Sequence, residues 1–109
     1  MIPDNIEILP PWSSLDRSGE QSRAEQLTAE LKIELAPDHV LYDVPVKALA
    51  TRIDRDDVLF EIEGSINRLA VVHLTWQREA DPKWPTVQYF KDWDHWVKEE
   101  MNPAHEVHS

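Results

Sequence analysis

The chain has 109 residues, of which 41% are hydrophobic, and 21 acidic against 11 basic residues give it a net charge of −10. This length suits one domain (1–109), the absence of cysteine excludes disulfides and thiolate chemistry, and the scattered basic residues argue against a nucleic-acid ligand. No apolar run approaches a membrane span and no export signal begins the chain, so we expect a soluble, cytoplasmic protein without a membrane partner.

The first third of the chain predicts an extended arm followed by a helix. Residues 1–17 contain three prolines and several apolar side chains, which favours an arm packed against the domain. The pattern then predicts a helix near residues 20–36, ended by Pro37 because proline disfavours helical geometry at Ala36. Its start has two candidate capping boxes, formed by Ser22 with Glu25 or by Ser18 with Gln21. The predicted apolar side is Ala24, Leu27, Leu31 and Leu35, and the predicted polar side is Glu25, Glu30, Lys32 and Glu34.

Alternating apolar residues in the middle of the chain predict three antiparallel strands near 44–53, 57–63 and 68–76, with Gly64 to Asn67 as the second connection. If Ile53 pairs with Asp57, then Lys47 lies opposite Glu63. An odd-residue second connection would put Val58, Phe60, Ile62, Ala70, Val72, Leu74 and Trp76 on one face. An even-residue connection would move the third strand's residues to the other face, and the pattern leaves both registers open.

Residues 77–88 are polar and flanked by proline, which predicts an ordered loop held by Trp84. A closing helix near 92–101, capped by Asp92 and ended at Asn102-Pro103, precedes a frayed tail over 103–109. The predicted fold is therefore α+β, a three-stranded antiparallel β-meander with an N-terminal and a C-terminal helix (α-β-β-β-α).

Three segments resemble a group of small uncharacterised bacterial proteins. They are Leu35–Tyr42, Asp56–Glu61 (D-D-V-L-F-E) and Ala70–Trp76 (A-V-V-H-L-T-W), and the tryptophan-proline loop around Trp84 belongs to the same pattern. The resemblance spans roughly residues 25–101. The size is also similar to that of proteins encoded by integron gene cassettes. The resemblance implies a bacterial α+β domain and carries over no activity or functional residues.

Tryptophan usage indicates where a ligand would bind. Five of the nine aromatic residues are tryptophan, more than a small core needs when leucine would serve without an indole N–H to satisfy. Core packing explains part of this, since Trp93 and Trp96 lie on the predicted helix stripe. The functional alternative is an aromatic wall that attracts an organic cation, with carboxylates at its rim. The predicted ligand-binding residues are Trp76, Trp84, Trp93, Trp96, Glu61, Glu79 and Asp81.

Two classes of function remain open. The first, which we favour, is a non-catalytic acidic binding module for a basic protein partner or an organic cation. The second is a small enzyme in which His73, which lies beside Glu61 or Thr75 depending on register, acts as general base and is oriented by Glu61 or by an acid of the 79–81 loop. Having only two glycines weighs against the enzyme, because active-site loops often need permissive backbone positions. The sequence shows no metal-ligand or cofactor motif, so we expect neither.

The apolar residues on both predicted sheet faces also suggest a homodimer. Leu59, Leu69 and Val71 would otherwise face water in a three-stranded sheet with open edges.

Overall fold

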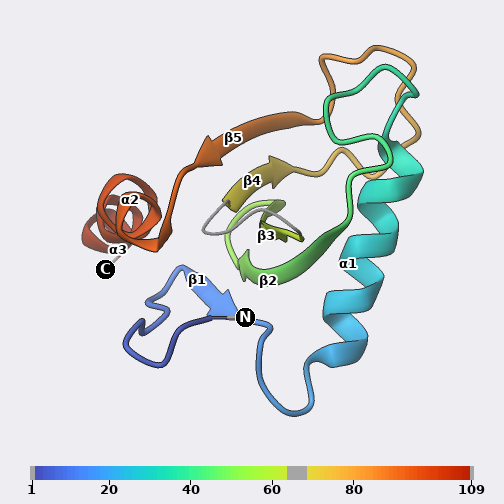
Figure 1. The fold of residues 1–109 in the computed structure, drawn as a ribbon. Helices are drawn as coiled ribbons and strands as arrows, with labels where there is room; N and C mark the ends of the chain where they lie inside the picture. Colours follow the sequence, from blue (N-terminus) through green and yellow to red (C-terminus); the bar gives the residue numbers. More distant parts are fainter. Residues whose placement is uncertain (1, 64–68, 109) are drawn as a thin grey trace.

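The computed structural model describes residues 2–63 and 69–108, and of His108 the backbone alone. Within these ranges the chain forms a five-stranded antiparallel sheet with helices on both sides, an α+β arrangement (Figure 1). The strand order follows the chain order, β1-β2-β3-β4-β5. The elements are β1 (Trp12–Ser14), α1 (Gln21–Glu34), β2 (Val46–Arg52), β3 (Asp57–Ile62), β4 (Leu69–His73), β5 (Thr86–Phe90), α2 (Trp93–Trp96), the π-helical turn η1 (Val97–Met101) and α3 (Asn102–His108).

The predicted three-stranded meander is wrong, because a further strand extends it at each edge. β2, β3 and β4 form the centre of the sheet, β1 pairs with the end of β2, and β5 pairs with β4 along its whole length. β1 has three residues and lies in the proline-rich arm, whereas β5 occupies the end of the segment predicted as a loop. Most side chains of β5 are not buried, so it lacks the apolar alternation on which the prediction rested.

The pairing of β3 with β4 settles the register that the sequence left open. Val58 lies opposite Val72 and Phe60 opposite Ala70, as an odd-residue connection requires. These side chains share one buried cluster, while Leu59 belongs to a second cluster on the other face. The predicted connection itself, Gly64 to Asn67, lies outside the described residues.

The register predicted between the first two central strands is wrong by a β-bulge. Lys47 lies opposite Glu61 rather than Glu63, and the pairing shifts between Ala48 and Ala50. The extra residue places these two alanines on opposite faces, one in each buried cluster. A bulge leaves no signal in an alternating pattern this short, so the sequence predicted an unbroken ladder.

Helix α1 covers one face of the sheet (Figure 1), where Leu27 and Leu31 pack in the same cluster as Phe60. Neither predicted capping box forms, because the helix begins at Gln21 and its N-cap, Glu20, makes no side-chain cap bond. The helix also ends at Glu34, two residues earlier than predicted. Leu35 is already extended, which directs its side chain into the core and leaves Ala36 free of helical geometry before Pro37.

The opposite face is covered by the N-terminal arm and by the C-terminal helices (Figure 1). Trp12 and Trp96 meet there edge to face, with ring centroids 5.3 Å apart, and Phe90 and Met101 complete the cluster. Leu59, Leu69 and Val71, which suggested a dimer, are all buried within the chain. The physical reason given for a homodimer is therefore removed.

The C-terminal helix begins as predicted and ends later. Asp92 accepts a hydrogen bond from His95 N through Oδ1 (2.8 Å) and so caps α2. The helix does not stop at Asn102-Pro103 but continues to His108, so the predicted frayed tail is wrong. Pro103 directly follows the π-helical turn η1, in which Asn102 N donates to the carbonyl oxygen of Val97, and this local change of hydrogen-bond pattern lets the helix continue past a residue without an N–H. In the described part of the chain, no helix has the length and apolar character needed to cross a membrane.

The connection from α1 to β2 (residues 35–45) and the connection from β4 to β5 (residues 74–85) meet beyond the C-terminal end of α1 (Figure 1). His39 is buried there, and its Nδ1 accepts a hydrogen bond from Leu41 N (3.0 Å). The Nε2–H of the same ring therefore donates to the carbonyl oxygen of Pro85 (2.9 Å). This bond joins residues 36–44 to the start of β5.

Trp96 lies in the core and Trp84 is exposed, so replacing each with alanine should lower the free energy of unfolding by different amounts. Trp96→Ala should lower the free energy of unfolding by about 3–5 kcal/mol, as truncation of a buried aromatic does. Trp84 is 45% exposed, so Trp84→Ala should cost less than about 1 kcal/mol. Urea unfolding followed by far-UV circular dichroism measures both. Equal losses in the two variants would contradict the assignment of Trp96 to the core.

Candidate functional site

The carboxylate of Glu34 fixes the chain that leaves β4. Its side chain is fully buried at the last residue of α1. Oε1 accepts hydrogen bonds from Thr75 N (2.8 Å) and Thr75 Oγ1 (3.1 Å), and Oε2 accepts one from Trp76 N (2.9 Å). The Glu34 carbonyl oxygen accepts a fourth bond from Glu79 N (3.0 Å). A buried carboxylate is costly unless it is hydrogen-bonded, and these donors supply that compensation.

Trp76 is held in a backbone conformation that its residue type disfavours. Its φ of 60° lies in the left-handed region, where a non-glycine residue costs of the order of 1–3 kcal/mol. Such a conformation persists where the surroundings determine it, and the hydrogen bonds to Glu34 on both Thr75 and Trp76 do so. The indole nevertheless gains little burial, since Trp76 is 55% exposed. The backbone strain thus presents a large aromatic ring to solvent.

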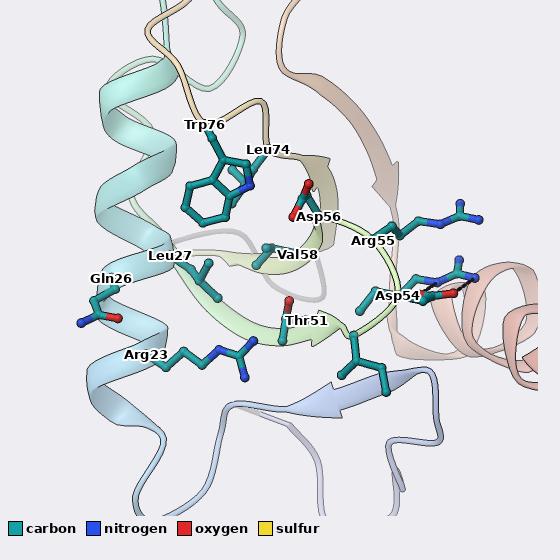
Figure 2. A pocket seen from close by; sticks show the side chains of 12 residues that line it. Arg23, Gln26, Leu27, Thr51, Asp54, Arg55, Asp56, Val58, Leu74 and Trp76 are labelled. Carbon is teal, nitrogen blue, oxygen red and sulfur yellow. Dashed lines mark hydrogen bonds and ion pairs between the residues drawn. The ribbon is translucent and has the colours of Figure 1, made fainter.

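The Trp76 ring borders a hollow of about 590 Å³ between α1 and the turn that joins β2 to β3 (Figure 2). Three buried side chains, Leu27 of α1, Val58 of β3 and Leu74, give the hollow an apolar floor. A backbone hydrogen bond from Leu74 N to the carbonyl oxygen of Asp56 (2.9 Å) joins this floor to the β2–β3 turn. A hollow of this size is in the range that holds a small organic molecule.

Charged groups of both signs face this hollow (Figure 2). The Asp56 carboxylate lies on the Trp76 side, and the Arg23 guanidinium reaches in from α1 at the other end, near the Thr51 side chain. Arg55 also borders the hollow, but its guanidinium points away from it. The groups directed inward are therefore one indole ring, one carboxylate and one guanidinium.

Arg52 is engaged elsewhere. Its Nε and Nη2 donate to the two carboxylate oxygens of Asp54 (2.7 and 3.2 Å), and Nη1 lies 3.6 Å from Glu100 Oε1 of η1. The hydrogen bond from Arg52 is the main cause that lowers the pKa of Asp54 below its ordinary value. These contacts tie the β2–β3 turn to the C-terminal helix and neutralise Arg52.

Glu30 lies one helical turn before Glu34, and this neighbour raises the pKa of the Glu30 carboxyl group. The hydrogen bond to Glu34 contributes most, followed by burial and the negative charge of Glu34, and together they raise the pKa of Glu30 from 4.5 to about 7. The carboxylate that holds Trp76 therefore has beside it a carboxyl group whose pKa is close to neutral.

This raised pKa predicts a pH dependence of stability. Between pH 4.5 and about 7 the folded chain keeps the Glu30 proton that the unfolded chain releases, so this contribution to stability is lost as the pH rises. Glu30→Gln stays neutral and avoids the loss. The stability of Glu30→Gln relative to wild type should therefore increase from pH 4.5 to 7, measured by urea unfolding at each pH. Glu25→Gln, an exposed change on the same helix, is the control. Parallel pH profiles for wild type and Glu30→Gln would contradict the raised pKa of Glu30.

His73 is paired with Asp57 and not with Glu61 or Thr75 as predicted. The two residues lie opposite each other on β3 and β4, with His73 Nδ1 2.7 Å from Asp57 Oδ1. Asp57 is buried, whereas half of the His73 side chain is exposed in a hollow of about 300 Å³. An oriented imidazole can act as a base through its second nitrogen. The same contact is also a common way to stabilise adjacent strands.

Glu100 lines this second hollow as well. Burial is the largest cause that raises the pKa of Glu100, and the negative charge of Asp57 adds to it, while Arg52 and Arg55 oppose the shift. Most of the described residues that line the His73 hollow are polar or charged, and none of them is phenylalanine, tyrosine or tryptophan.

The predicted tryptophan wall is divided between two layers. Trp76 borders the hollow on the α1 side of the sheet. Trp96 is completely buried on the other face, edge to face with Trp12 and Trp93. Trp84 lies in the connection before β5 and does not line the Trp76 hollow. Of the four predicted tryptophans, the site thus contains Trp76.

The three predicted acidic residues also lie outside the Trp76 hollow. Glu61 is on β3 opposite Lys47 and Leu69. Glu79 accepts a hydrogen bond from Gln77 Nε2 (2.9 Å), and Asp81 accepts one from Lys83 N (2.9 Å). The last two carboxylates therefore shape the loop after Trp76.

Four residues that matter for the site escaped the sequence prediction: Glu34, Arg23, Asp56 and Thr51. Glu34 carried a signal, since it follows Leu31 by three positions and so belongs to the buried side of the helix, not to the polar side predicted. Arg23 and Asp56 carried none, because nothing in the sequence indicates that the start of α1 lies beside the β2–β3 turn.

Comparisons of the chain with protein-family models, with curated proteins and with solved structures gave no match. The resemblance to small bacterial proteins therefore stays a prediction. Among residues 2–63 and 69–108, no group of three histidine, cysteine, aspartate or glutamate side chains is placed to hold a metal ion.

Proposed function

We propose that the protein is a non-catalytic binding module for a small organic cation, held in the hollow beside Trp76. The observation that carries this proposal is the indole itself. The chain keeps Trp76 at φ 60° through hydrogen bonds to the buried carboxylate of Glu34 and leaves Trp76 55% exposed over an apolar floor. The hydrogen bonds to Glu34 account for the backbone conformation, but they do not require an indole at this position, and the ring buries too little surface to explain it by core packing.

The charges at the hollow support a cation on the Trp76 side. The face of a tryptophan ring attracts cations, and Asp56 adds a carboxylate on the same side of the hollow. Arg52 is neutralised by Asp54 and Glu100, and Arg55 points away. The net charge of −10 also raises the local concentration of cations around the molecule.

The apolar floor favours an organic cation over a metal ion. A methylated ammonium group is weakly hydrated and can contact Leu27, Val58 and Leu74 while its charge faces Trp76 and Asp56. A metal ion would need several oxygen ligands, and Asp56 is the only carboxylate that points into the described hollow.

Choline is a suitable probe of this proposal. Addition of choline chloride should shift the indole N–H resonance of Trp76 and the backbone amide resonances of Leu27 and Val58 saturably in heteronuclear NMR spectra, and these two amides report the affinity of variants at position 76. Trp76→Ala should weaken binding by roughly 2- to 30-fold, the equivalent of a cation–π contact of about 0.5–2 kcal/mol. Asp56→Asn should weaken it as well, because the carboxylate no longer balances the ammonium charge.

Trp84→Ala is the matched control, since it removes an exposed tryptophan outside the hollow and should leave the choline affinity unchanged. Sodium chloride at the same concentrations controls for ionic strength. The proposal fails if choline produces no saturable shift beyond that of sodium chloride, or if Trp76→Ala binds choline as tightly as wild type.

A further inference from the structure

Arg23 is the one group directed into the Trp76 hollow that a simple cation would not use. Its guanidinium points inward from the first turn of α1, at the end of the hollow away from Trp76 (Figure 2). A ligand with a positive charge alone would gain nothing from this residue and would be weakly repelled by it. The position of Arg23 therefore bears on what else the ligand carries.

Arg23 and Asp56 face the same hollow without pairing. Neither forms an ion pair with the other or with another side chain among the described residues. The contrast with the other charges of this region is clear, because Arg52 and Asp54 bind each other through two hydrogen bonds. Both unpaired groups are thus available to a ligand, one at each end of the hollow.

We infer that the ligand is a zwitterion, with an organic ammonium group at Trp76 and Asp56 and a carboxylate at Arg23. This inference rests on the proposed function and specifies its ligand class. The guanidinium is suited to a carboxylate because it offers a fork of parallel N–H donors. The Thr51 hydroxyl borders the same end of the hollow but donates to the carbonyl oxygen of Asp57 (3.4 Å), so Arg23 is the donor that a carboxylate would use there.

A purely anionic ligand fits the hollow less well. It would use Arg23 but would bring its negative charge toward Asp56 and into the field of a chain with net charge −10. It would also leave the Trp76 face, which is electron-rich, without a favourable partner. A zwitterion satisfies the two charges and the ring together.

The test compares choline with trimethylammonium carboxylates of increasing chain length, beginning with glycine betaine and 4-(trimethylammonio)butanoate. Butanoate serves as the anion without the ammonium group. The best zwitterion should bind wild type about two- to fivefold tighter than choline, the gain expected of a solvent-accessible ion pair. Titrations are followed by the shift of the Trp76 indole N–H resonance, as for choline.

Arg23→Gln should remove this gain, so that the best zwitterion and choline bind with equal affinity, while the affinity for choline does not fall. Arg17→Gln is the matched control, because it makes the same charge change at an exposed residue outside the hollow and should keep the gain. Both changes are at exposed positions, and circular dichroism verifies that each variant is folded.

The outcomes separate the two proposals. If choline binds through Trp76 but no zwitterion binds more tightly, the zwitterion inference is overturned and the cation module stands. A gain that survives Arg23→Gln overturns the inference in the same way. If butanoate binds as tightly as the best zwitterion, the hollow is an anion site and both proposals are wrong. Absence of binding by every probe overturns both.

Discussion

The hydrogen bonds from Thr75 and Trp76 to the buried carboxylate of Glu34 are the contacts on which the rest of the site depends. They join the last residue of α1 to the chain that leaves β4, and Glu79 N adds a bond to the Glu34 carbonyl oxygen. Without these donors the carboxylate would be buried at a cost of several kcal/mol, so helix and turn depend on each other. The conformation of Trp76 follows from this mutual dependence.

The layered arrangement explains why the hollow lies where it does. One face of the sheet is sealed by α1 and the other by the arm and the C-terminal helices, so the strands leave little apolar surface exposed (Figure 1). The β2–β3 turn (residues 53–56) is exposed, and Arg52 at its start anchors it to Glu100 of η1. The space between this turn and α1 remains open, and Trp76 and Arg23 border it.

The sequence predicted the features that depend on local pattern and missed those that depend on tertiary contact. The alternation around Val58 and Val72 identified β3 and β4, and Asp92 identified the start of α2. β1 and β5 carry no such pattern. Hydrogen bonding to β2 and to β4, respectively, stabilises them more than burial of their own side chains does, so the sequence alone does not reveal them. The tryptophans could be counted but not assigned to a face, so Trp76 and Trp96 were placed together although the sheet separates them. The fold alone places Arg23 and Asp56 at the same hollow.

The most direct test of the Glu34 contacts compares glycine and alanine at position 76. If Glu34 holds this residue at φ 60°, Trp76→Gly should unfold with a free energy about 1 kcal/mol higher than Trp76→Ala, because alanine alone is strained there. The difference should disappear when Glu34→Gln replaces one accepting oxygen with an NH₂ group that cannot accept a hydrogen bond. Urea unfolding of Trp76→Gly and Trp76→Ala, each with and without Glu34→Gln, gives the difference in unfolding free energy in both backgrounds. If Trp76→Ala is as stable as Trp76→Gly in the otherwise wild-type chain, Glu34 does not impose this conformation.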